Sequence, residues 1–294
     1  MPGTESTLPP PGEPAAPQRV TGVLVPFDGS DFSRAAVPVA TALAHRLDAE
    51  VHVLSVVDSV QKVEARQHAL AGLDVPGPMA HREVVVDRDP AGAIHEALHK
   101  LDDAVICMAT HGRARSAALL GSVASDVVAR GRDPLVLVCP LVERAPWGTG
   151  VVACVDGGPA SAPLVAVAAR WSDLLGEPLT VLTVAEDAPR PVTGGPVRRR
   201  FGPDGDAGAV LDALAAPHRE GGRDVATVVW PEPVNVGMGI EGYLGEHPAA
   251  LVVTNTRSTT GLRRLILGSA AAAIVRHSPS PVLVVPLPAG GPQP

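Results

Sequence analysis

The two halves of this chain carry one pattern twice, and this duplication limits the possible folds more than any other feature. Residues 111–140, HGRARSAALLGSVASDVVARGRDPLVLVCP, return in altered form as residues 257–286, RSTTGLRRLILGSAAAAIVRHSPSPVLVVP. Upstream, Asp28 in VPFDGS has a counterpart in Asp156 of ACVDGG. A repeat period of about 146 residues has the size of a domain and is too long for the units of a solenoid. The sequence therefore predicts one duplicated domain.

Length and composition fit two compact domains. A chain of 294 residues corresponds to about two domains of roughly 100 to 200 residues each. The hydrophobic share of 46% is ample for two cores, whereas an aromatic share of 2% leaves Val, Leu, Ile and Ala to build them. Aliphatic cores of this kind are typical of parallel strands that are covered on both faces.

The net charge and the cysteines limit the possible binding partners and the cellular compartment. A net charge of -7 and a pI near 5.8 disfavour nucleic acid or an anionic membrane as a partner. The polar, proline-rich start does not resemble a signal peptide, and no apolar run reaches the roughly 18 residues of a membrane-spanning helix. Cys107, Cys139 and Cys154 lie in or beside predicted strands, which suits buried thiols in a reducing compartment. We therefore expect a cytoplasmic protein.

Strand and helix patterns alternate along the first half. Apolar runs predict strands, and amphipathic stretches between them predict helices, of which 61–72 has the weakest pattern. The predicted strands are 20–27, 51–57, 82–87, 104–109 and 134–139, and the predicted helices are 31–47, 61–72, 90–101 and 122–130. This alternation requires crossover connections, so it predicts an α/β fold with a parallel sheet and helices on both faces.

The second half repeats this order from Val151. It carries a looser insertion rich in Pro, Gly and Arg at residues 189–208, where we expect a mobile loop. The apolar pattern breaks at LVERAPWGTG, residues 141–150. We therefore predict a disordered tail, a first domain, a linker, a second domain and a short final tail, at residues 1–18, 19–141, 142–149, 150–288 and 289–294.

Four short motifs resemble the universal stress protein family. They are VPFDGS at the end of the first strand, a fourth strand that runs into HGR, LLGSV at the opening of a helix, and a closing PLVLV strand. The resemblance covers residues 19–288, and the second copy makes the chain similar to the tandem-domain type. It implies a doubly wound, five-stranded parallel sheet in the order 3-2-1-4-5 in each domain. It also implies that the fifth strands pair the domains as an internal pseudo-dimer, and it leaves a homodimer open.

Many members of that family bind ATP, with Mg²⁺ or Mn²⁺ as the counter-ion, through a G-x2-G-x9-G-(S/T) motif after the fourth strand. In the first domain the matching positions are Ala109, Gly112, Gly121 and Ser122. Glycines let the backbone approach phosphates, and a helix start offers free N–H groups. The first glycine is replaced by Ala109, and eight residues separate Gly112 from Gly121 where the motif has nine. Loss of one residue could move the loop by about 3 Å.

Other contact positions of the family carry over to the first domain. The resemblance implies that Asp28, beside Pro26, reads the adenine edge. It implies that Val56 forms a wall against the base and that Met108 lies at the end of the fourth strand. Ser122 and the Val123 amide would take phosphate oxygens. The alternative is structural, because an aspartate often caps a turn and Gly-Ser often starts a helix.

The second domain keeps the motif spacing but has changed the residues. Gly268 and Ser269 remain, and Ser258 and Asn255 stand where the two loop glycines belong. Cys154 replaces the proline of the first domain, while Asp156 and Val184 occupy the positions of the aspartate and the wall residue. A side chain at Ser258 obstructs close backbone approach. We therefore expect one nucleotide per chain, in the first domain.

Two hypotheses of an enzymatic function compete with that of nucleotide binding. HEALH, from His95 to His99, matches H-E-x-x-H, which places two zinc ligands on one helix face. The core stripe of that helix, Ile94 and Leu98 among others, puts both histidines on its flank, and the second copy lacks the pattern. DGSDFS offers parts of the pyrophosphate loop of ATP pyrophosphatases but lacks its leading serine and paired glycines. A Walker loop is absent from the sequence, and Cys107 is better read as a core thiol.

These observations favour a stress-response protein that binds ATP and is not an enzyme. The alternative is a scaffold in which both nucleotide sites have lapsed and only interactions with an unknown protein partner remain. The sequence identifies neither the partner nor the stress.

Overall fold

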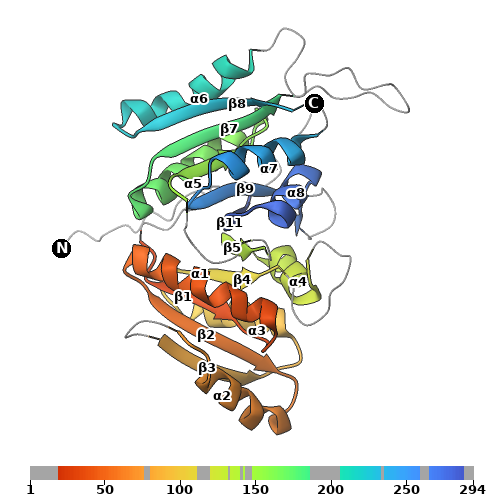
Figure 1. Ribbon diagram of the computed structural model, residues 1–294. Helices are drawn as coiled ribbons and strands as arrows, with labels where there is room; N and C mark the ends of the chain where they lie inside the picture. The colour runs from red at the N-terminus through yellow and green to blue at the C-terminus, as the bar shows by residue number, and fades with distance from the viewer. Residues whose placement is uncertain are drawn as a thin grey trace, which may run out of the picture.

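The computed structural model describes residues 19–75, 80–110, 120–131, 133–139, 142, 148–185, 206–232, 235–258 and 265–287. In this part of the chain, two α/β halves are stacked end to end along one sheet (Figure 1). The predicted tails, most of the linker and most of the 189–208 insertion lie outside the described residues.

The first half contains the predicted alternation of strands and helices. The weak pattern at residues 61–72 corresponds to a 3-10 turn followed by a short helix. Its elements are β1 (Gly22–Pro26), α1 (Asp31–Leu47), β2 (Glu50–Val57), η1 (Val60–Lys62), α2 (Val63–Ala71), β3 (Ala80–Val86), α3 (Pro90–His99), β4 (Ala104–Ala109), α4 (Ser122–Arg130) and β5 (Leu135–Val138).

The second half repeats this order and adds one short strand. Its elements are β6 (Val151–Cys154), α5 (Ser161–Leu175), β7 (Leu179–Ala185), α6 (Ala207–Glu220), β8 (Val225–Pro231), α7 (Val236–Glu246), β9 (Leu251–Ser258), β10 (Leu265–Ile266), α8 (Ser269–His277) and β11 (Val282–Pro286). The added strand, β10, pairs antiparallel with the end of β9.

The sheet order confirms the predicted topology. The main path runs β3-β2-β1-β4-β5-β11-β9-β6-β7-β8. Within each half the neighbours on this path are parallel, and each half has the order 3-2-1-4-5. The halves meet where β5 and β11 pair antiparallel, with Val136 opposite Leu283. The fifth strands therefore form the internal pseudo-dimer that the sequence predicted.

Local sequence signals set the helix starts. At α1, the Ser30 hydroxyl oxygen accepts a hydrogen bond from the Ser33 backbone N–H at 3.1 Å, which caps one of the open donors of the first turn. At α3, the Asp89 carboxylate accepts from the Gly92 N–H, and Pro90 occupies the first turn, where a missing N–H costs nothing.

Two hydrophobic layers cover the sheet, one on each face. Alternate residues of β1 point to opposite sides: Val23 and Val25 contribute to the layer under α1, α2, α5 and α6. Leu24 contributes to the layer under α3, α4, α7 and α8. Each layer contains buried residues from both halves. The two repeats therefore share continuous cores across their junction.

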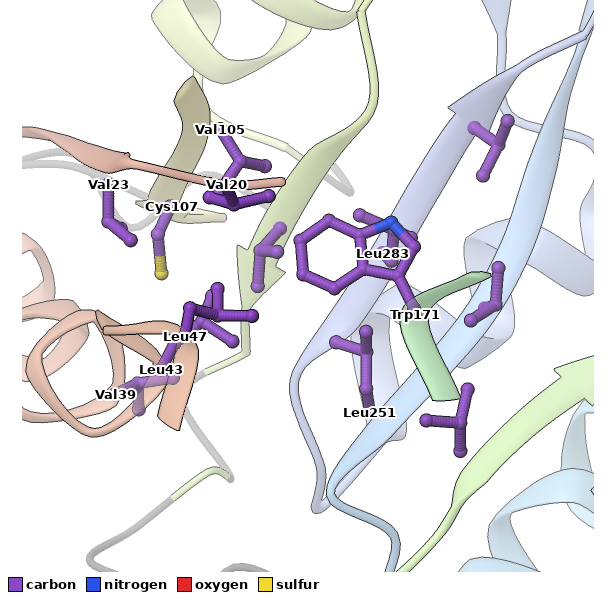
Figure 2. Packing of buried hydrophobic residues seen from close by; sticks show 14 of the residues in the cluster. Val20, Val23, Val39, Leu43, Leu47, Val105, Cys107, Trp171, Leu251 and Leu283 are labelled. Carbon is purple, nitrogen blue, oxygen red and sulfur yellow. The ribbon is translucent and has the colours of Figure 1, made fainter. Parts of the chain in front are cut away.

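Trp171 of α5 lies at the junction of the halves. Its side chain is fully buried, and Figure 2 shows it between Leu43 and Leu47 of the first half and Leu251 and Leu283 of the second. Its indole N–H finds no hydrogen-bond partner among the described residues. The residue therefore acts in the junction through apolar packing.

Polar contacts also cross the junction. The Arg46 guanidinium lies 2.8 Å from the Glu177 carboxylate, whose other oxygen accepts from the Gly150 N–H. The Cys139 thiol donates to the Arg276 carbonyl at 2.8 Å. The ion pair is partly exposed, so we expect it to contribute little beside the buried tryptophan.

Replacement of Trp171 by alanine is expected to lower the free energy of unfolding by about 3–5 kcal/mol, because the change leaves a cavity in a shared core. Trp171→Phe should cost less, since it keeps most of the ring and removes an unpaired N–H. Guanidinium denaturation measures both, with Arg46→Ala as a control that should cost about 0–1 kcal/mol. A loss from Trp171→Ala no larger than that from Arg46→Ala would show that the junction does not depend on this side chain.

Candidate functional site

The candidate site lies at the carboxyl ends of β1 and β4. These strands are neighbours in the sheet. After β1 the chain enters α1 on one face, and after β4 it enters α4 on the other. In open α/β sheets, ligands bind at such a switch point, outside the carboxyl ends of the strands. Pro26, Asp28, Met108 and Ala109 are brought to this edge by the topology alone.

Asp28 follows β1 in a tight turn. Its Oδ1 accepts a hydrogen bond from the Ser30 N–H at 2.9 Å, and Gly29 between them has φ +81°, a conformation that favours glycine. The turn is tied to β2, because the Phe27 N–H donates to the Leu54 carbonyl and the Ser55 hydroxyl donates to the Phe27 carbonyl. The half-buried carboxylate is therefore held in a fixed place at the sheet edge.

Three apolar side chains lie on the α4 side of the same edge. Met108, at the end of β4, is 5% exposed, whereas Val56 of β2 and Val123 of α4 are only partly buried and pack against the same hydrophobic layer. Val56 and Val123 therefore offer a partly open apolar surface, with Met108 buried beneath it, on the face that also carries the start of α4.

The start of α4 has open backbone donors. Gly121 is its N-cap, with extended backbone at φ -61° and ψ 161° and without a side-chain capping hydrogen bond. The Gly121 N–H donates to the Thr110 carbonyl at 2.8 Å, which fixes the helix start next to β4. The first N–H groups of a helix have no partner within it and carry the positive end of its dipole. Ser122 at the first position is exposed.

Thr110 was not singled out from the sequence. It is 1% exposed, and its backbone N–H donates to the Val138 carbonyl. Through these bonds it links β4, β5 and α4. Its counterpart Thr256 lies within β9, the fourth strand of the second half, so an identical residue at one place of both repeats was the available signal. Gly112 lies outside the described residues, and the effect of the shortened loop stays a prediction.

The second half builds the same turn. The Gly158 N–H donates to Asp156 Oδ1 at 2.9 Å, and Gly157 has φ +73°. The Thr183 hydroxyl donates to the Val155 carbonyl, as Ser55 does to Phe27 in the first half. The helix start is also repeated, because Gly268 is an N-cap without a side-chain hydrogen bond and Ser269 begins α8.

Other parts of the second site differ. Val184, the counterpart of Val56, is 8% exposed because α7 approaches it closely: a Cβ added to Gly239 would lie 2.6 Å from Val184 Cγ1. Cys154, in place of Pro26, is buried, and burial raises the pKa of its thiol to about 12. The apolar wall is therefore more closely covered in the second half than in the first.

Asn255 and Ser258 belong to a strand, and not to a loop as the motif alignment predicted. β9 continues to Ser258, where it pairs with Leu265 of β10, while Asn255 pairs with Val285 of β11. The backbone N–H groups of this region are thus drawn into a sheet. The resulting β9–β10 hairpin also brings β10 against α4 of the first half.

The residues of the competing enzyme motifs that the structure describes make ordinary structural contacts. His95 Nε2 lies 3.1 Å from the Val127 carbonyl of α4, and Glu96 forms an ion pair with Lys100. His99 is exposed. Cys107 is fully buried in β4, which raises the pKa of its thiol to about 12. These contacts fit a helix flank and a core thiol.

Comparison with known proteins places the chain in a family. The sequence pattern of the universal stress protein family matches residues 21–72, 59–138 and 150–286. A universal stress protein from Archaeoglobus fulgidus superposes with a TM-score of 0.60 at 19% identity, over 90% of this chain and 98% of that one. A putative universal stress protein from Pseudomonas aeruginosa gives 0.58 at 16% identity, over 91% and 94%.

A functionally unknown protein from Pseudomonas aeruginosa PAO1 gives a TM-score of 0.59 at 15% identity, over 91% of this chain and 93% of that one. These identities support the fold alone. No curated protein sequence matches the chain. The family match, by contrast, extends over most of both halves. The chain belongs to the universal stress protein family.

Proposed function

We propose that the first half binds an adenine nucleotide, ATP with Mg²⁺ or Mn²⁺, and that the protein acts as a stress-response regulator by binding and not by catalysis. The observation that carries this proposal is the α4 start without a side-chain cap at Gly121, next to the Asp28 turn at the switch point of the sheet. We place this function in the cytoplasm, consistent with three buried cysteines that form no disulfide. No helix in the described part of the chain has the length and apolarity to span a membrane.

The phosphates would bind at α4. Its first N–H groups, at Ser122 and Val123, point away from the helix body, and the dipole favours an anion at this end. The exposed Ser122 hydroxyl can add one hydrogen bond. The divalent cation would neutralise phosphate charge, which a chain of net charge -7 does not offset by itself.

The base would bind at the carboxyl ends of β2, β1 and β4. Val56 would supply apolar contact above the buried Met108, and the Asp28 carboxylate can accept a hydrogen bond from an exocyclic amino group such as that of adenine. The turn that holds Asp28 keeps the carboxylate in place before a ligand arrives. A preorganised acceptor costs less ordering on binding.

The second half is proposed to be the pairing partner. Its Asp156 turn and Gly268 helix start repeat those of the first half. However, Val184 is covered by α7, and Ser258 lies in a strand. One nucleotide per chain is therefore proposed.

A nucleotide-independent scaffold is the second candidate. It is favoured by one observation: the aspartate turn is equally well formed in both halves, although the second half has lost its loop glycines. A structural role would explain the conserved geometry without any ligand.

Millimolar Mg·ATP is expected to raise the melting temperature by several degrees, because a ligand that binds only the folded state adds about 2.7 kcal/mol at a hundredfold excess over Kd. Differential scanning fluorimetry of nucleotide-free protein measures this shift, with Mg²⁺ alone as the control. An unchanged melting temperature, together with no nucleotide released from denatured protein, favours the scaffold.

Gly121→Val is expected to abolish ATP binding and to leave the fold intact. The extended backbone of Gly121 accepts valine without strain, but the branched side chain would occupy the approach of the phosphate. The matched control is Gly268→Val, at the same place with φ -64° and ψ 164°, which should bind normally. Circular dichroism and calorimetric titration compare the two. Lost binding in the Gly268 variant alone would place the working site in the second half.

Ser122→Ala is expected to weaken ATP binding by about 1.5–3 kcal/mol, the value of a hydrogen bond to a charged group. Since Ser122 is exposed, unfolding free energy should change little. Titration calorimetry gives both the affinity and the number of sites, which should be one per chain. Equal ATP affinities of wild type and variant would show that the Ser122 hydroxyl does not contact the nucleotide. A stoichiometry of two nucleotides per chain would contradict the proposed difference between the halves.

A further inference from the structure

Three side chains with metal-binding atoms converge at the opposite edge of the first half. Glu50 and His52 are two residues apart on β2, so they project from one face of the strand. His81 of β3 is the register partner of His52. This edge lies at the amino ends of the parallel strands, whereas the candidate nucleotide site lies at their carboxyl ends. The Glu50–His52–His81 cluster is therefore separate from that site.

The donor atoms of this cluster are close enough for one ion. His81 Nε2 lies 3.1 Å and His52 Nε2 lies 3.5 Å from the same oxygen, Oε2 of Glu50. All three donor atoms fall within 4.8 Å of one another. Bonds of about 2.0–2.2 Å to zinc at tetrahedral angles put neighbouring ligand atoms roughly 3.4 Å apart. The observed separations of the donor atoms are close to this spacing.

The two imidazole rings are stacked, with centroids 4.7 Å apart and planes 10° from parallel. An imidazole nitrogen binds a metal ion in the plane of its ring, so one ring must turn about its side-chain bonds before both nitrogens bind one ion. Gly22 of β1 lies beside the His52 ring, and a Cβ at that position would be in ordinary contact with the ring at 3.5 Å. The pairing of β2 with β3 holds the two histidines on adjacent strands, so their separation does not depend on a loop.

The exposure of the three ligands increases from His52 to His81. The side chains of His52, Glu50 and His81 are 20%, 35% and 60% exposed. A metal ion could enter from the His81 side, and water could complete the coordination there. Three protein ligands with one open position is a common zinc arrangement.

The second half provides an internal comparison. The register that joins His52 to His81 joins Thr180 to Ala226 in the second half, and Pro178 stands at the position of Glu50. None of these residues offers a strong metal ligand. In the part of the chain that the structure describes, no other group of three such side chains converges.

We propose that Glu50, His52 and His81 form a binding site for one divalent transition-metal ion, of the class that includes zinc, on the first half only. Imidazole and carboxylate ligands suit zinc, and imidazole also suits copper and nickel. The rival explanation is that Glu50 links the two histidines by hydrogen bonds and only stabilises the pairing of β2 with β3.

The test uses the full chain. Metal is first removed with EDTA, the EDTA is then removed, and the protein is titrated with Zn²⁺ in a calorimeter at neutral pH. We expect one saturable site per chain and a higher melting temperature with zinc. His81→Ala, which removes the most exposed ligand, should weaken zinc binding at least about tenfold because two ligands remain. Glu50→Gln should weaken it as well, while circular dichroism shows an unchanged fold for both.

His99→Ala is the matched control, since it removes an exposed histidine of the H-E-x-x-H sequence and should leave zinc binding unchanged. Absence of a saturable site in the wild type would overturn the proposal in favour of the hydrogen-bonded cluster. Equal zinc affinity in wild type and His81→Ala would overturn it too, because the metal would then bind elsewhere. Loss of binding in His99→Ala alone would assign the ion to α3.

Discussion

The antiparallel pairing of β5 with β11 is the interaction on which the rest of this structure depends. Both strands are buried, and a parallel five-stranded sheet that ended at either would expose an apolar edge to solvent. Pairing the two edges satisfies their backbone groups and joins the sheets into one. It also brings α1 and α5 together, so that Leu43 and Trp171, which occupy equivalent places in the repeat, lie on the two sides of the junction (Figure 2).

This shared frame allows the two halves to differ at the ends of their strands. The aspartate turn, at Asp28 or Asp156, and the helix start are present in both halves. Each of them stabilises the fold in addition to any role in holding a ligand. The surroundings diverge: Val184 is covered where Val56 is partly open, and β9 extends into a hairpin where β4 ends at Ala109. The proposed ligand chemistry, nucleotide at one edge and metal at the other, is therefore confined to the first half, with the second half as its structural complement.

Much of the fold could be predicted from the sequence, since buried parallel strands appear as apolar runs and the duplication fixes their order twice. The sequence could not predict the β9–β10 hairpin, because RSTTGLRRLIL has the polar and glycine content of a loop. It also could not place Val184 under α7, which depends on the small size of Gly239. The Glu50–His52–His81 cluster was missed because its histidines come from different strands and meet only through the register of β2 and β3.

A crystal structure of the protein grown with Mg²⁺ and a non-hydrolysable ATP analogue would show which half binds nucleotide. We expect one nucleotide per chain, with its phosphates at the first turn of α4 and its base between Asp28, Val56 and Met108, and no nucleotide at α8. Nucleotide bound at α8, or at both helix starts, would contradict the proposed division between the halves. If the crystals are grown with a saturating concentration of the analogue and the structure contains no bound nucleotide, the proposal of nucleotide binding is contradicted.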